Sequence, residues 1–276
     1  MTMLASAALP GEEEPATPAA DPATALLRVE NLSREFGGVL AIENLSFTVS
    51  RGDIHSIIGP NGAGKTTLFN LITGVYKPSG GRVLFDGATV SGLPPYRLAE
   101  RGMSRTFQNL QIFFNMTALE NVMVGRHLHL NGRLLPALFR FPSLVRKDRE
   151  ARDAAAELMA SVGLAKYVDA HASSMPYGAL KRLEIARALA SEPKLLLLDE
   201  PAAGLNATES REIDEVIKTV AAGGVTVILV EHDMKMVMGI SHRITALNYG
   251  RKLAEGTPAE VAANPDVVAA YLGTMD

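Results

Sequence analysis

One glycine-rich stretch carries the clearest chemistry in this chain, and it reads Gly59-Pro60-Asn61-Gly62-Ala63-Gly64-Lys65-Thr66-Thr67. It fits the phosphate-binding pattern G-x-x-x-x-G-K-[ST]. Lys65 would reach the β- and γ-phosphates of a nucleotide, and the Thr66 hydroxyl would ligate Mg²⁺. The loop's backbone N–H groups and the positive end of the next helix would hold the phosphates. The alternative is a glycine-rich turn that matches by chance.

Two adjacent carboxylates, Asp199 and Glu200, follow the apolar run 195–198. A continuous apolar run is typical of a parallel strand buried on both faces, and ligands gather at the carboxyl ends of such strands. In P-loop nucleotide hydrolases an Asp at this place helps to hold Mg²⁺. A core strand that ends in solvated acids would explain the leucines well but the carboxylate doublet less well.

A second apolar run, 225–230, ends at Glu231-His232-Asp233. A single histidine is more often structural than functional. His232, however, follows a buried strand, on the side of the sheet where Asp199 and Glu200 emerge, so we expect it near the γ-phosphate.

The elements that must position these groups can be read from hydrophobic spacing and turn residues. Residues 54–58 predict a strand before the loop, and 67–72 predict a helix after it. Short strands at 26–30, 45–49 and 82–86 indicate a small antiparallel sheet beside the P-loop sheet. Further expected elements are a helical stripe over 148–162, a helix over 179–189 with Pro176 in its first turn, strands at 244–248 and 252–254, and a helical segment 258–272 interrupted at 264–265.

Between about 93 and 190 the patterns typical of strands give way to helical ones. Three features in or near this region allow more than one interpretation. Phe36 could be a core residue or a ring on which a base stacks. Gln108 lies in a polar, loop-like stretch, 105–109. The arginine-rich segment 126–150 could face a membrane or an acidic partner, or it could be a helix pair with a solvated face.

The bulk composition limits the function classes. The chain has 276 residues, a formal charge of −3 and no cysteine, which argues against nucleic acid as the main partner and excludes disulfides and thiolate metal sites. Residues 1–24 predict a disordered tail. We expect a cytoplasmic protein whose membrane role needs a partner, because no run reaches about 18 apolar residues and the acidic N-terminus does not resemble a secretory signal.

From residue 26 onward, the order of motifs resembles the ATP-binding cassette (ABC) ATPases. The match includes an aromatic at 36, the P-loop, a glutamine at 108, a stretch at 175–182, the carboxylate pair and a histidine at 232. More narrowly, the chain resembles the LivG-type ATPase subunits of branched-chain amino acid importers in the segments 59–70, 105–109, 201–206 and 270–273.

The resemblance implies an α/β fold with a P-loop NTPase (RecA-like) core, a small antiparallel β subdomain and an inserted helical subdomain. The cassette would span 25–276, with the helical subdomain at about 93–190 and a C-terminal helical segment at about 256–276.

The resemblance also implies a role for each matching residue, with ATP and Mg²⁺ as the ligands. The catalytic residues would be Lys65, Gln108, Glu200 and His232, and the metal residues Thr66, Gln108 and Asp199. Phe36 would stack on adenine, and Glu200 would polarise the attacking water. The nucleotide-binding residues would be Phe36, Asn61, Gly62, Ala63, Gly64, Lys65, Thr66 and Thr67, and, across a head-to-tail dimer, Met175, Pro176, Tyr177 and Gly178.

The stretch at 175–179 departs from the usual Leu-Ser-Gly-Gly-Gln. Pro176 removes a hydroxyl and a backbone N–H, although a Pro-Tyr-Gly form occurs in the LivG-type group, which the stretch therefore resembles. Ala179 stands where a glutamine is usual.

The resemblance therefore implies an ATPase subunit of an importer for branched-chain or other amino acids, bound to the cytoplasmic face of the membrane. Its partners would be two permease subunits, a second cassette (identical or different) and, indirectly, a solute-binding protein, with no nucleic acid. Amide or urea uptake and lipid or polysaccharide export are alternatives within transport. A soluble ABC ATPase of translation or DNA maintenance is an alternative outside it, and a P-loop kinase or GTPase would not explain Gln108, Glu200 and 175–182 together.

Overall fold

The fold comes from a computed structural model that describes residues 24–128 and 142–272. The predicted tail therefore lies outside the described residues except for Thr24, as does the middle of the arginine-rich segment 126–150. Among the described residues, no helix combines the length and apolar character needed to cross a bilayer.

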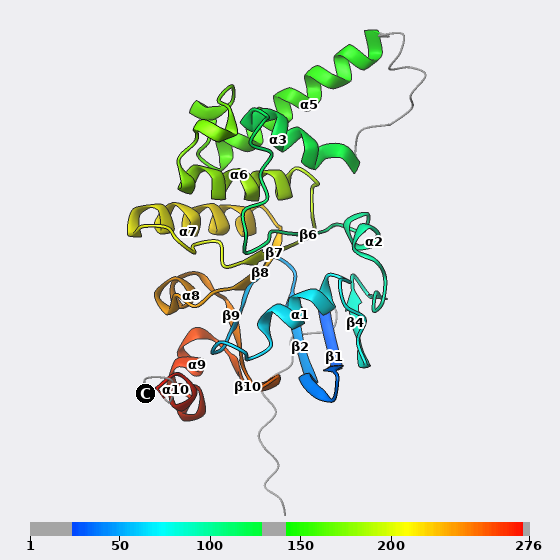
Figure 1. The fold of residues 1–276 in the computed structure, drawn as a ribbon, viewed down its shortest axis with the longest axis vertical. Coiled ribbons are helices and arrows are strands. Elements are labelled where there is room, and N and C mark those ends of the chain that lie inside the picture. Colours follow the sequence, from blue (N-terminus) through cyan, green and yellow to red (C-terminus); the bar gives the residue numbers. More distant parts are fainter. Residues whose placement is uncertain (1–23, 129–141, 273–276) are drawn as a thin grey trace, which may run out of the picture.

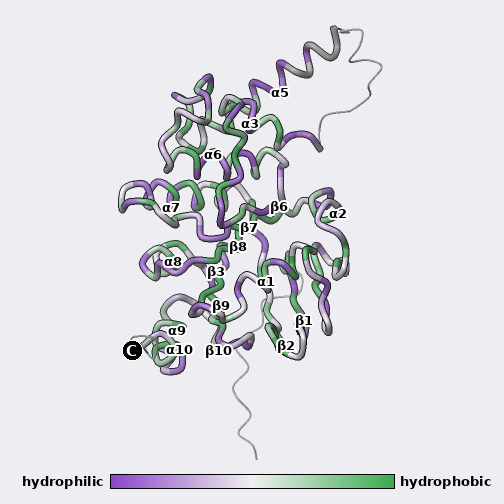
Figure 2. The backbone as a smooth tube through the Cα atoms, in the orientation of Figure 1, coloured by the Kyte–Doolittle hydropathy of each residue, from purple (hydrophilic) through white to green (hydrophobic). Residues whose placement is uncertain are grey.

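A six-stranded sheet forms the centre of the molecule, in the order β10-β9-β3-β8-β7-β6 (Figure 1). Its strands are parallel except for β10, which pairs antiparallel with β9. The bounds are β3 Ile54–Ile58, β6 Met103–Arg105, β7 Leu195–Asp199, β8 Thr226–Val230, β9 Arg243–Asn248 and β10 Arg251–Gly256. Figure 2 shows hydrophobic residues along the central strands, as expected for strands covered on both faces.

A second sheet of four antiparallel strands, in the order β2-β1-β4-β5, lies beside the first. Its strands are β1 Ala25–Phe36, β2 Val39–Ser50, β4 Gly80–Phe85 and β5 Ala88–Thr89. The helix after the glycine loop, α1 (Lys65–Ile72), shares one core with both sheets through Leu68 and Phe69. This arrangement confirms the predicted antiparallel sheet.

The leucine run of β7 divides between two cores because side chains alternate along a strand. Leu195 and Leu197 join the core under α1, whereas Leu196 and Leu198 join the core under the helices on the other face. All four are 0 % exposed. The uninterrupted apolar run is therefore required by layers on both faces of the sheet.

Helices cover that other face and extend away from it (Figure 1). They are α3 Ala118–Gly125, α5 Pro142–Ser161, α6 Tyr177–Leu189 and α7 Ala207–Ala222. Shorter helices lie at the edges: α2 Pro95–Ala99, α8 Met234–Ile240, α9 Pro258–Ala263 and α10 Pro265–Leu272. The interruption predicted at 264–265 is confirmed, because α9 ends at Ala263 and α10 begins at Pro265.

The prediction that Gln108 lies in a loop is confirmed, because 106–109 form neither helix nor strand. Arg105, however, ends the short strand β6, whose Met103 pairs with Leu195 of β7. Three residues are too few to give a recognisable alternation. Pro176 does not lie in the first turn of α6; it is the extended residue before the helix, which begins at Tyr177.

Candidate functional site

The glycine loop connects the buried strand β3 to α1, in the strand–loop–helix context that the motif requires. Gly64 precedes the helix with φ 103°, and a Cβ there would lie 2.8 Å from the Ala41 carbonyl oxygen. Only glycine tolerates both conditions. No group in the described chain accepts a hydrogen bond from the backbone N–H of Gly64, Lys65 or Thr66, as is usual for the first N–H groups of a helix.

The Lys65 ammonium is hydrogen-bonded to the backbone of the glycine loop itself. Its Nζ donates to the carbonyl oxygens of Gly59 at 2.6 Å and Pro60 at 3.1 Å. Burial lowers the pKa of Lys65, while the charges of Glu200 and Asp199 oppose that shift. Those two carboxylates are therefore close enough to act on the ammonium, although they come from a strand more than 130 residues later.

The carboxylates emerge where β7 and β8 end side by side, with Asp199 opposite Val230 in the register. Glu200 has a left-handed backbone, φ 50°, and its N–H donates to the Val230 carbonyl at 2.9 Å. A positive φ is unfavourable for glutamate, so the pairing of this turn with β8 fixes it.

Three predicted residues meet at Glu200. The Gln108 amide Nε2 donates to Glu200 Oε2 at 3.1 Å, and His232 Nδ1 lies 4.0 Å from the same oxygen. His232 is 65 % exposed, whereas its neighbour Glu231 is 1 % exposed and anchors the turn through the N–H groups of Ala202 and His232. The prediction that His232 lies on the same side as the carboxylates is confirmed.

Phe36 lies apart from this cluster, at the end of β1. Its ring is 39 % exposed, the Arg34 guanidinium stacks over it at 4.4 Å, and the Tyr76 ring meets it edge-on at 5.2 Å. The ring is therefore held by neighbours but keeps an accessible surface. Both roles predicted for it, packing and stacking, remain compatible with this environment.

The stretch 175–179 is at the start of α6, and none of the described hydrogen bonds or ion pairs connects it to the P-loop. Met175 and Ala179 are buried in the helical core, at 7 % and 1 % exposure, while Tyr177 is 45 % exposed. Gly178 packs so closely on α7 that a Cβ would lie 2.7 Å from Glu209 Oε1. In this chain, position 179 is a core position, which explains why an alanine fits there.

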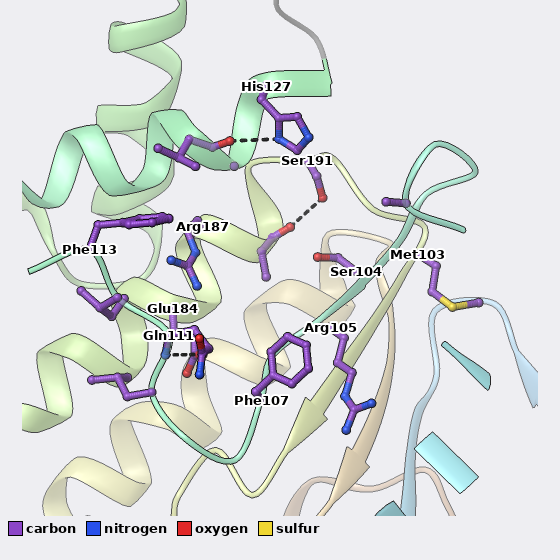
Figure 3. Close-up of a pocket in the computed structure, with 16 residues that line it drawn as sticks. Met103, Ser104, Arg105, Phe107, Gln111, Phe113, His127, Glu184, Arg187 and Ser191 are labelled. Carbon is purple, nitrogen blue, oxygen red and sulfur yellow. Dashed lines mark hydrogen bonds between the residues drawn. The ribbon is translucent and has the colours of Figure 1, made fainter. Parts of the chain in front are cut away.

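A pocket of about 470 Å³ lies next to the Gln108 segment, between that segment, the end of α3 and α6 (Figure 3). Phe107 and Phe113 line it, and Arg187 lies over the Phe113 ring at 5.5 Å. Glu184, at 3 % exposure, accepts from the Gln111 N–H at 3.2 Å, and burial raises the pKa of its carboxyl. The pocket thus combines exposed rings with a buried acid and a cation.

Sequence reasoning missed two buried charged residues of the site, Arg105 and Glu231. Arg105 NH2 pairs with Asp199 Oδ2 at 2.8 Å, and both side chains are at most 8 % exposed. Arg105 contacts the predicted Asp199, and Glu231 directly precedes the predicted His232. Their spacing in the sequence, however, does not distinguish them from charged residues exposed to solvent.

Comparison with known proteins identifies the family. The model described as ABC transporter matches residues 42–203, and the model described as Branched-chain amino acid ATP-binding cassette transporter matches 251–276. The chain is 46 % identical over 249 residues to the high-affinity branched-chain amino acid transport ATP-binding protein BraF of Pseudomonas aeruginosa, covering 90 % of this chain and 98 % of BraF. It is 47 % identical to LivG of Escherichia coli, with the same coverage of each chain.

The fold gives the same result. A crystal structure of an ATP-binding cassette of an ABC transporter in its ADP conformation superposes with a TM-score of 0.79 at 33 % identity, covering 90 % of this chain and 99 % of that one. The predicted fold class is therefore confirmed, and the chain is an ABC ATPase. It belongs to the ATP-binding proteins of ABC transporters, in the branched-chain amino acid family that includes LivG and BraF.

Proposed function

We propose that this chain is the ATP-hydrolysing subunit of a high-affinity importer of branched-chain amino acids. The main support for the proposal is that Gln108 and His232 both lie close to the Glu200 carboxylate. This carboxylate lies on the edge of the sheet that faces the glycine loop. The match covers 98 % of the length of BraF and of LivG, and both are named as branched-chain amino acid transport proteins. We infer the solute of this chain from those names.

In this proposal the glycine loop holds the phosphates of ATP. The unpartnered N–H groups of Gly64, Lys65 and Thr66, with the start of α1, favour an anion. The Lys65 ammonium, which donates to two carbonyl oxygens in the described chain, would exchange them for phosphate oxygens. Asn61, Gly62, Ala63 and Thr67 complete the loop, and Phe36 offers its exposed ring to adenine.

The donor set fits Mg²⁺, which prefers oxygen ligands and takes one or two carboxylates together with phosphates. Thr66 would supply a hydroxyl, Asp199 a carboxylate and Gln108 an amide oxygen. When bound, the ion would neutralise charge on the β- and γ-phosphates. Glu200 would polarise the attacking water, and His232 would donate to the γ-phosphate.

The site would be completed by a second cassette, because 175–178 has no hydrogen bond or ion pair to the P-loop within the described chain. The exposed Tyr177 ring and the start of α6 would then face the partner's ATP. We further propose that the pocket beside Gln108 receives a cytoplasmic segment of one of two permease subunits. In this proposal the chain lies on the cytoplasmic face of the membrane and interacts with a solute-binding protein only indirectly, through the permeases.

Labelled-leucine uptake tests this function in cells that lack the chain. Wild type and Glu215→Gln should restore uptake, since Glu215 is a surface residue of α7 with a side chain 73 % exposed. Glu200→Gln should not restore it. The purified variant should bind ATP and dimerise, but hydrolyse ATP at least about 100-fold more slowly than wild type, the scale of a lost general base.

Two results would contradict the proposal separately. Wild-type ATP turnover in Glu200→Gln would remove Glu200 from the hydrolytic role. Uptake of branched-chain amino acids that does not depend on the chain, despite normal ATPase activity, would show that the solute belongs to another class.

A further inference from the structure

Arg105, the last residue of β6, is a buried cation that connects this strand to β7 and to α1. Its NH2 donates to Asp199 Oδ2 at 2.8 Å, and its NH1 donates to the Asn70 side-chain oxygen of α1 at 2.6 Å. NH1 also lies 3.2 Å from the Thr73 hydroxyl. One guanidinium therefore ties the last residue of β7 to the helix that follows the glycine loop.

The surroundings of this ion pair fix its geometry. The Arg105 and Asp199 side chains are 8 % and 7 % exposed. The guanidinium carbon lies 5.4 Å from the Phe69 ring centroid and 5.1 Å from that of Phe107, in cation–π range. A planar fork that contacts two rings and donates to acceptors on two elements suits arginine and not lysine.

The same segment also reaches the neighbouring carboxylate. Gln108, three residues after Arg105, donates to Glu200 at 3.1 Å. Residues 105 and 108 thus each hold one member of the carboxylate pair, from one short segment. Arg105 and Phe107 also line the pocket of Figure 3, so this segment lies between that pocket and both carboxylates.

We propose that Arg105 is a positioning residue for Asp199: it fixes one carboxylate oxygen so that the other is presented toward the metal position near Thr66. This rests on the proposed Mg²⁺–ATP site. A free Asp199 side chain would have to lose rotamer freedom when the metal binds, and Arg105 removes that cost in advance.

Binding of a fluorescent ATP analogue to the purified full chain, with EDTA or with increasing Mg²⁺, tests the proposal. Arg105→Gln should change the affinity in EDTA less than about twofold, since the glycine loop is intact. The Mg²⁺ concentration that half-maximally tightens binding should rise about tenfold, the scale of one lost charge-assisted hydrogen bond. Arg105→Lys, which keeps the charge but not the fork, should recover only part of the Mg²⁺ response.

Arg182→Gln is the control for loss of an arginine ion pair away from the two carboxylates, with a partner, Glu212, whose side chain is 45 % exposed. Arg182 is 13 % exposed and pairs with Glu212 at 3.2 Å, between α6 and α7. It should lower the melting temperature but leave the Mg²⁺ requirement at the wild-type value. If Arg105→Gln does not fold, the comparison of Arg105→Lys with wild type and Arg182→Gln decides the question.

The proposal is overturned if the Arg105 variants lower affinity equally with and without Mg²⁺, or if their Mg²⁺ requirement matches that of Arg182→Gln. Either result would leave Arg105 a purely structural residue. Failure of the proposed function looks different, because wild type itself would then bind no ATP analogue or show no Mg²⁺ response.

Discussion

His55, in the strand that leads into the glycine loop, should make the stability of the protein depend on pH. The ring is 0 % exposed; its Nε2 lies 2.8 Å from the Thr245 hydroxyl, and the Phe47 ring packs against it. Burial, together with the nearby charges of Arg243 and Lys252, lowers the pKa of His55 to about 3. The folded protein therefore holds this ring neutral at any moderate pH.

The sign follows from proton linkage. An unfolded chain takes up a proton on His55 near its ordinary pKa of 6.5, whereas the folded chain does not until about 3. The unfolded state therefore gains about 1.4 kcal/mol for each pH unit below 6.5. Well above pH 6.5 the buried His55 carries no such cost, and at pH 5, which is 1.5 units below 6.5, it should lower the free energy of unfolding by about 2 kcal/mol.

Urea unfolding at about pH 7.5 and pH 5.0 measures this cost when wild type is compared with His55→Gln. Glutamine has no charge to gain, so wild type should lose about 2 kcal/mol more than the variant between the two pH values. Other titrating groups cancel in the comparison. His127→Gln, which removes an exposed histidine, should lose as much as wild type. Equal losses in wild type and His55→Gln would refute the reasoning.

Two further substitutions probe the nucleotide site. Gly64→Ala should weaken ATP binding at least about tenfold in equilibrium titrations, because φ 103° and a contact of 2.8 Å to the Ala41 carbonyl force the loop to move. Gly224→Ala, at φ 90° with nothing within 4 Å, is its control and should bind ATP normally. Phe36→Ala should weaken ATP binding about fivefold to tenfold, the scale of one lost aromatic stack, while Phe36→Tyr should keep wild-type affinity. Equal affinity of Phe36→Ala and wild type would assign the ring to packing alone.

Local patterns in the sequence were enough to predict the parts of the site that are themselves local. The loop 59–67 is a contiguous motif between an apolar strand and an amphipathic helix, and both elements form. The runs before Asp199 and His232 predict buried strands, because only strands covered on both faces need apolar residues at every position. The order of those motifs along the chain also indicated the family to which the protein belongs.

Tertiary structure alone decided which side chains meet. The sheet order sets β6 beside β7, and this brings Arg105 to Asp199 across 94 positions of sequence. Gln108 reaches Glu200 for the same reason, across 92 positions. No local period encodes such a pair, since a three-residue strand carries no recognisable alternation and a buried arginine looks like a solvated one in sequence. The motifs therefore determined which chemical groups the site contains, whereas long-range packing of the sheet determined how those groups are arranged.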